Sequence, residues 1–166
     1  IALYFLANRK IAANSAAGNC TFHYNKATVL SGRRQYRQAL KEFNFALALD
    51  PSDSMSYLGV GNVYYPIGDF ASAVKSYKKA LELSPYFFDS HFNLAIVYNE
   101  MGMFQDAREH FRQVLAIKPD DCAAHYNLGL LYQKQGLNKL AMAEYQRALE
   151  IEPGHQQILQ AIKELE

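Results

Sequence analysis

The sequence predicts an all-α fold, an α-solenoid of stacked antiparallel helix pairs, and three observations lead to this prediction. Prolines, alanines and aromatic residues each recur at a spacing of 34 residues. Within each period the apolar residues lie three and four positions apart, which is the spacing of one helix face. Glycines divide three of the periods near the middle, where a helix must end and the chain must reverse. The recurring residues are Pro51, Pro85, Pro119 and Pro153; Ala39, Ala73, Ala107 and Ala141; Phe43, Tyr77, Phe111 and Tyr145; and Gly68, Gly102 and Gly136.

Each period is therefore expected to form a helix, a tight turn, a second helix and a second turn. Proline ends the second helix because it lacks an N–H group and disfavours helical backbone in the residue before it. Pro66 departs from the pattern, since it falls late in the first helix of the second period. We expect it to end that helix early, just before Gly68; a local widening of the surface beside it is the alternative.

The repeating unit resembles the tetratricopeptide repeat, a helix pair of 34 residues with Leu-Gly, Tyr, Ala, Phe and Pro at set positions. The four repeats would cover residues 20–53, 54–87, 88–121 and 122–155. The fourth matches best, with the run HYNLGLLY. The first matches least, with Lys26 where an apolar residue is expected and Arg34 where glycine is usual. The resemblance implies a right-handed superhelix whose stability comes from the stacking of neighbouring repeats.

Both ends of the chain are expected to cover this stack. Residues 156–166 would form an amphipathic helix that caps the fourth repeat. Residues 1–19 would form either a packing helix on the first repeat or the remnant of an earlier repeat, with a helix over residues 1–17 that ends at Gly18–Asn19. The cut end of a membrane helix is the alternative, because residues 1–7 are apolar and basic residues follow. The sequence starts at Ile1 rather than Met, which indicates a fragment or a processed form.

Composition argues against several classes of function. The 17 Lys and Arg residues nearly balance the 16 Asp and Glu residues, so the chain lacks the basic excess that nucleic acid requires. Cys20 and Cys122 are too isolated to indicate a disulfide scaffold or a metal site. His23, His91 and His125 share one repeat position, but packed helices lie roughly 10 Å apart, too far for all three to bind one metal ion.

The sequence also lacks recognisable catalytic and phosphate-binding motifs. It contains no nucleophile elbow and no glycine-rich phosphate loop. We therefore expect no enzymatic activity, no cofactor and no bound metal. No apolar run reaches the roughly 18 residues that a membrane span needs. We predict a cytoplasmic protein, and any membrane attachment would come through a segment upstream of Ile1.

The family resemblance implies that the first helices of the repeats line a concave groove. Residues offset from the packing signature would face this groove, which is aromatic, rich in amides and nearly uncharged. Three of the four repeats carry asparagine at the same position. Position by position, the groove residues would be Tyr24, Leu58, Phe92 and Tyr126; Asn25, Gly59, Asn93 and Asn127; Thr28, Asn62, Ile96 and Leu130; and Ser31, Tyr65, Asn99 and Gln133.

A row of asparagines at one-repeat spacing suits an extended chain, because each amide both donates to and accepts from a peptide backbone. We therefore predict an interaction scaffold that binds an extended peptide or partner segment. The candidate binding residues are Tyr24, Asn25, Asn62, Tyr65, Phe92, Asn93, Tyr126 and Asn127. A similar row occurs in the superhelical repeats of O-linked N-acetylglucosamine transferase. The alternative function is thus the substrate-recruiting region of a larger multidomain enzyme such as a glycosyltransferase. A further alternative is that these asparagines are only solvated surface residues.

The partner is expected to be a protein or peptide, with no nucleic acid and no small-molecule substrate. Chaperone-binding members of the family hold a terminal carboxylate with basic residues and two asparagines. Asn62 and Asn93 fall at the asparagine places, but Leu58, Ala123 and Asn127 occupy the basic places. Without cations, a carboxylate would lose its charge-assisted hydrogen bonds. We therefore do not expect a partner of that type.

Overall fold

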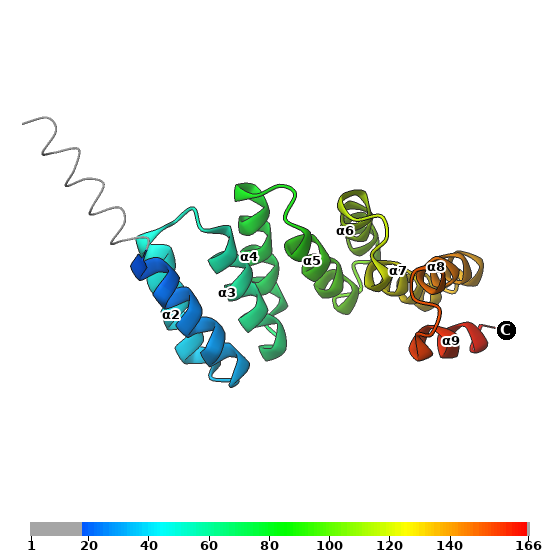
Figure 1. Ribbon diagram of the computed structural model, residues 1–166, viewed down its shortest axis with the longest axis horizontal. Coiled ribbons are helices and arrows are strands. Elements are labelled where there is room, and N and C mark those ends of the chain that lie inside the picture. Colours follow the sequence, from blue (N-terminus) through cyan, green and yellow to red (C-terminus); the bar gives the residue numbers. More distant parts are fainter. Residues whose placement is uncertain (1–17, 166) are drawn as a thin grey trace, which may run out of the picture. The chain divides into compact units, whose positions relative to one another are not determined.

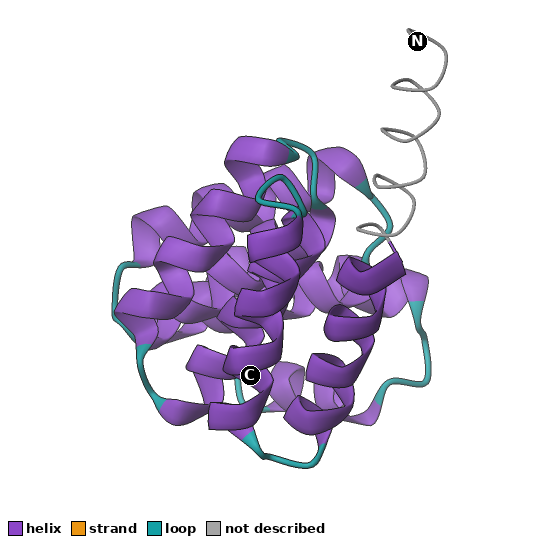
Figure 2. Cartoon of the chain, turned by 90° about the vertical axis from the view of Figure 1, so that its left-hand side faces the viewer, coloured by secondary structure: helices purple, strands orange, loops and turns teal. Residues whose placement is uncertain are grey.

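Helices form all of the regular secondary structure in residues 18–165, the part of the chain that the computed structural model describes (Figures 1 and 2). The first described helix covers residues 18–32. It is followed by α2 (Tyr36–Leu49), α3 (Ser54–Ile67), α4 (Phe70–Leu83), α5 (Phe88–Glu100), α6 (Phe104–Ile117), α7 (Cys122–Lys134), α8 (Asn138–Ile151) and α9 (Gln156–Lys163). The all-α prediction is confirmed, because two helices per period and a final helix lie where the sequence pattern places them.

The helix predicted over residues 1–17 lies outside the described residues. Its predicted end at Gly18–Asn19 is wrong, because both residues belong to the helix over residues 18–32. A glycine weakens a helix by only about 1 kcal/mol relative to alanine. Burial of Cys20 and Ala27 on the same helix outweighs that loss, since they are 9% and 0% exposed.

One left-handed residue makes the turn between the two helices of each repeat. Gly68, Gly102 and Gly136 have φ angles of 84°, 73° and 71°, and the predicted glycine turns are confirmed. The first repeat makes the same turn with Arg34, whose φ is 59°. A residue with a side chain loses about 1–2 kcal/mol in this conformation. The first repeat therefore carries local strain that the other three avoid.

The second repeat's first helix ends just before Gly68, as expected, and Pro66 lies inside its last turn. α3 continues through Pro66 to Ile67 and ends at the left-handed Gly68. Proline there removes one backbone hydrogen bond in the last turn. The turn is closed by other donors, because the N–H groups of Gly68 and Asp69 donate to Tyr65 and Tyr64 at 3.0 and 3.2 Å.

The chain divides into two compact units, Ile1–Pro85 and Tyr86–Glu166, which we call the N-terminal unit and the C-terminal unit. In the N-terminal unit, α3 packs against both α2 and α4. One core cluster joins the helix over residues 18–32 with α2 and α3. Its members are Ala27, Ala39, Phe43, Val60 and Val63.

In the C-terminal unit, each helix from α5 to α9 packs against the next one, and α5 also contacts α7. Phe111 and Tyr145 are the large buried residues of the two second helices, each 0% exposed. α9 packs on α8 and buries Ile158 completely. The two first helices, α5 and α7, are thus neighbours, which matters for the candidate site.

Candidate functional site

The predicted binding residues all lie on the first helices of their repeats. In the C-terminal unit, α5 carries Phe92 and Asn93, and α7 carries Tyr126 and Asn127. Because α5 and α7 contact each other, these four residues lie on adjacent helices. In the N-terminal unit, the helix over residues 18–32 carries Tyr24 and Asn25, and α3 carries Asn62 and Tyr65.

The candidate aromatic residues are only partly exposed, because each packs on the second helix of its own repeat. The Tyr24 and Phe43 rings are 5.8 Å apart in an edge-on arrangement, and Phe92 and Phe111 repeat this contact at 5.8 Å. The Tyr126 and Tyr145 rings lie 5.9 Å apart. The edge-to-face contacts of Tyr24 and Phe92 are a preferred geometry of aromatic pairs, whereas the Tyr126 and Tyr145 rings are tilted by 37°. The aromatic residues therefore form the floor of the candidate surface and hold each helix pair together.

Asn62 is oriented by a buried tyrosine. The Tyr77 hydroxyl donates to Asn62 Oδ1 at 2.9 Å. Burial raises the pKa of the Tyr77 phenol far above its ordinary value, so this hydroxyl keeps its proton. The hydrogen bond turns the Asn62 oxygen towards α4 and the amide nitrogen away from that hydroxyl.

The asparagines of the C-terminal unit are in a different arrangement. Asn127 Nδ2 donates to the backbone oxygen of Ala123 at 2.7 Å, one turn earlier in α7. Asn93 is half-buried on α5. The candidate amides are therefore held in different ways, since Asn62 is held through its oxygen and Asn127, at another repeat position, through its nitrogen.

Two groove positions of the second repeat were predicted wrongly. Leu58 is 7% exposed and Gly59 is also buried. A Cβ atom added at Gly59 would overlap the Phe43 ring of the preceding repeat. Gly59 packs between repeats because the Phe43 ring projects from α2 onto it. The sequence contained a signal for this close contact, since only glycine fits under the ring.

The candidate surface also carries a charge that the sequence analysis missed. The Lys134 ammonium at the end of α7 lies 3.5 Å from Asn99 Oδ1 on α5. This contact joins the two first helices of the C-terminal unit. Lys134 directly follows Gln133, a predicted groove residue, so its position next to the groove could have been predicted from the sequence.

Histidines at the shared repeat position form paired contacts between the two helices of a repeat. His23 Nδ1 lies 2.6 Å from Glu42 Oε2, and His125 Nδ1 lies 2.8 Å from Glu144 Oε2. Residues 18–165 hold no cluster of three or more ligands that could bind a metal ion. His23 and His125 therefore connect the two helices of their repeats.

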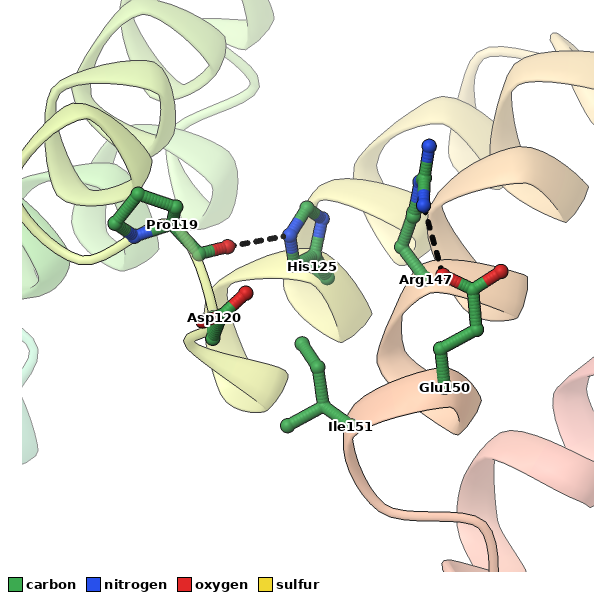
Figure 3. A pocket seen from close by; sticks show the side chains of 6 residues that line it. All are labelled: Pro119, Asp120, His125, Arg147, Glu150 and Ile151. Atoms are coloured by element: carbon green, nitrogen blue, oxygen red, sulfur yellow. Dashed lines mark hydrogen bonds and ion pairs between the residues drawn. The ribbon is translucent and has the colours of Figure 1, made fainter.

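A separate hollow of about 580 Å³ lies in the C-terminal unit, where the loop before α7 meets the end of α8 (Figure 3). His125 Nε2 donates to the Pro119 carbonyl at 3.0 Å, and Arg147 donates to Glu150 at 2.8 Å. His125, Arg147 and Glu150 are thus bonded within the protein itself. None of the predicted binding residues lines this hollow. Tyr24 lines a smaller one of about 290 Å³, beside Asp50 and Asp53.

Comparisons with known proteins agree with the repeat pattern. A family model described as TPR repeat matches residues 61–102 and 97–136, and one described as tetratricopeptide repeat matches residues 122–155. None of the curated proteins matches the chain by sequence. Across the part of the chain that the structure describes, no helix is long and apolar enough to cross a membrane.

Solved structures share the fold at low sequence identity. The crystal structure of MamA protein has a TM-score of 0.81 and 22% identity, and covers 90% of this chain and 81% of that one. Cut9, in the Cut9–Hcn1 hetero-tetramer of APC/C, has a TM-score of 0.80 and 19% identity, with 89% of this chain and 30% of that one covered. TTC0263, a thermophilic TPR protein of Thermus thermophilus, has a TM-score of 0.70 and 20% identity, with 88% and 80% covered.

Proposed function

Because the chain belongs to the tetratricopeptide repeat family, we propose that it is a non-catalytic protein-interaction scaffold that binds an extended segment of a partner protein. Arrays of this kind bury their apolar faces between repeats and leave the first helices as a continuous binding surface. Cut9, which has the same fold, is found in a hetero-tetramer with Hcn1. That assembly supports a protein as the partner.

The observation that carries the proposal is the pairing of α5 and α7 in the C-terminal unit. Asn93 and Asn127 are one repeat apart on these adjacent helices, both are half-buried, and each follows an aromatic residue, Phe92 or Tyr126, in the sequence. Partial burial restricts the side chains, so less conformational entropy is lost on binding. Main-chain recognition by amides explains why so little charge is needed.

The two amide orientations suit the two kinds of peptide group. Asn127 donates to Ala123 through Nδ2, which leaves its oxygen directed to accept from a peptide N–H. Asn62, in the N-terminal unit, accepts from Tyr77 and would donate to a peptide carbonyl. Each such hydrogen bond contributes about 0.5–1.5 kcal/mol.

Photo-crosslinking from defined positions tests the location of the site. A benzophenone side chain replaces Leu130, which is half-buried on α7 three residues after Asn127, or Gln146, which is exposed on the second helix α8. We expect the partner to crosslink to the chain that carries Leu130→p-benzoylphenylalanine. Capture of the partner only by the Gln146 variant would show that it binds to the second helices, contrary to the proposal.

A further inference from the structure

The second repeat differs from the other three in the side chains between its two helices. In the first, third and fourth repeats, a histidine on the first helix contacts a glutamate or histidine on the second helix, at 2.6, 2.9 and 2.8 Å. The second repeat has Tyr57 and Ser76 at these two positions. Ser76 Oγ donates to the Ser72 carbonyl of its own helix at 2.8 Å. Because serine is smaller than glutamate or histidine, less side chain fills this place in the second repeat.

A hollow of about 580 Å³ lies at this place, and its walls come from α2, α3 and α4. Tyr57 and Ser76 both line it. Its apolar lining is formed by Leu47 of α2 with Val60 and Tyr64 of α3. The volume lies in the range of roughly 300–1,000 Å³ that small-molecule sites occupy. None of the residues predicted to bind the extended segment lines this hollow, so it is separate from the first-helix surface.

The charged side chains that line this hollow are two lysines and one glutamate, which leaves one positive charge in excess. Lys75 and Lys79 line it from α4, together with Glu82. Glu82 Oε2 lies 2.7 Å from Lys79 Nζ, so these two charges offset each other. Across residues 18–165, the Lys75 ammonium makes no hydrogen bond or ion pair. Lys75 is therefore the cation that an anionic ligand could neutralise.

The fourth repeat has a hollow at the matching place with a different charge pattern. Its lining residues His125, Arg147 and Glu150 hold the repeat positions of three residues that line the second repeat's hollow. Arg147 is paired with Glu150 at 2.8 Å. Ala143 takes the position of Lys75. Of these two hollows, the one in the second repeat therefore offers the unpaired cation.

We propose that the hollow of α2, α3 and α4, here called the lysine hollow, binds a small molecule that carries a carboxylate or phosphate on an apolar body. The Lys75 ammonium binds the anionic group, because a hydrogen bond between ions is about twice as strong as a neutral one. The apolar body lies against Leu47, Val60 and Tyr64, which removes apolar surface from water. This ligand binds alongside the partner proposed above and is not a substrate.

Binding of matched small probes to the full chain tests this proposal. Benzoate and phenyl phosphate carry the proposed anionic groups on a phenyl ring, and benzyl alcohol is their neutral counterpart. In amide NMR spectra, both anions at millimolar concentration should shift resonances of α2, α3 and α4, with an affinity that falls as salt rises. Benzyl alcohol should bind more weakly. Lys75→Ala, which copies the fourth repeat, should weaken the binding of both anions about tenfold.

Lys139→Ala is the matched control, because Lys139 is an exposed lysine of the second helix α8 and does not line the lysine hollow. It should leave the affinity unchanged. Lys75 is also exposed, so its replacement should leave the fold intact, which circular dichroism checks. Ser76→Glu is a second variant, which restores the residue of the first and fourth repeats. It fills the hollow and adds a negative charge, so it should abolish binding of both anions.

Two results would overturn the proposal directly, which are equal binding of benzoate and benzyl alcohol and equal effects of the two lysine substitutions. Binding of a glutamate-rich peptide at the lysine hollow without binding of either small anion would also overturn it, since the ligand would then be a protein. Asn93→Ala/Asn127→Ala should not affect the small anions. This test can therefore fail while the proposed function of the first-helix surface holds.

Discussion

The second and fourth repeats differ from the first and third in how they fill the space between their two helices. The even repeats combine a glycine with a tyrosine, Gly61 with Tyr77 and Gly129 with Tyr145. At the same positions the odd repeats combine an alanine with a phenylalanine, which are Ala27 with Phe43 and Ala95 with Phe111. All four aromatic residues are at most 2% exposed, so both combinations make a closed core.

The tyrosine hydroxyl accounts for this difference. Tyr77 donates to Asn62 at 2.9 Å and Tyr145 donates to Gln133 at 2.6 Å, so each ring reaches across to the first helix. In that position a Cβ atom added at Gly61 or Gly129 would overlap the ring. Phenylalanine has no hydroxyl to form this hydrogen bond. The first and third repeats, which have phenylalanine here, carry alanine instead of glycine on the first helix. The comparison teaches that the small residue and the aromatic residue are chosen together.

The largest expected effect is that of Gly129→Ala. The added methyl group overlaps the Tyr145 ring and should destabilise the fold by about 1–3 kcal/mol. Adding Tyr145→Phe recreates the combination of the third repeat and should recover part of the loss. Urea unfolding of both variants measures these changes.

Gly154→Ala is the control for this experiment, because a Cβ atom there meets nothing within 4 Å. It should leave the free energy of unfolding nearly unchanged. The loss in free energy of unfolding of the double variant could equal the sum of the losses of Gly129→Ala and Tyr145→Phe. In that case the two residues would act independently, which would contradict the conclusion that they are chosen together.

A smaller effect is expected for Tyr145→Phe alone. The variant loses the hydrogen bond to Gln133, which should lower the free energy of unfolding by about 1 kcal/mol near neutral pH. Tyr86→Phe is the control, since Tyr86 is 85% exposed. Unchanged stability in the Tyr145 variant would contradict a structural role for the hydroxyl.

The same variant has a pH signature. Burial, with smaller contributions from Tyr126 and Glu164, raises the pKa of Tyr145 from 10 to about 12. A pKa raised by folding stabilises the protein fully below pH 10, and this contribution is lost as the pH rises from 10 to about 12. Wild type should therefore lose stability more steeply over this range than Tyr145→Phe. Parallel curves would show that the phenol is not desolvated by folding.

The smallest effect concerns the turn of the first repeat. Arg34 holds the left-handed conformation that glycine holds in the other three repeats. Arg34→Gly relieves this strain but makes the unfolded chain more flexible, so a net stabilisation of less than about 1 kcal/mol is expected. Thermal unfolding detects it as a small rise in Tm. A fall in Tm would mean that the Arg34 side chain makes contacts that outweigh its backbone strain.

Period and turn chemistry were enough to predict the helices, because Gly68 and Pro85 act through backbone geometry that is local in sequence. The end at Gly18 was not predictable, since burial of neighbouring residues decided it against the local preference. Gly59 was misplaced for a similar reason, as the structure shows the Phe43 ring of the preceding repeat lying against it.

The candidate site was predictable in its location on the first helices and not in its hydrogen bonds. A sequence places Asn62 and Asn127 on helices but cannot show that Tyr77 holds one and Ala123 holds the other. Those bonds depend on side-chain rotamers, which follow from packing. The binding role of these asparagines remains a prediction.

The most direct test of that role is a calorimetric titration. The partner protein that photo-crosslinking identifies is titrated, without a crosslink, into three forms of the chain. They are wild type, the double variant Asn93→Ala/Asn127→Ala, and the control Gln113→Ala/Gln146→Ala, which removes two exposed amides from second helices. The asparagine variant should bind more weakly by about 1 kcal/mol for each lost hydrogen bond, with little dependence on salt, and the control should bind like wild type. Equal affinities of wild type and the asparagine variant would contradict the account.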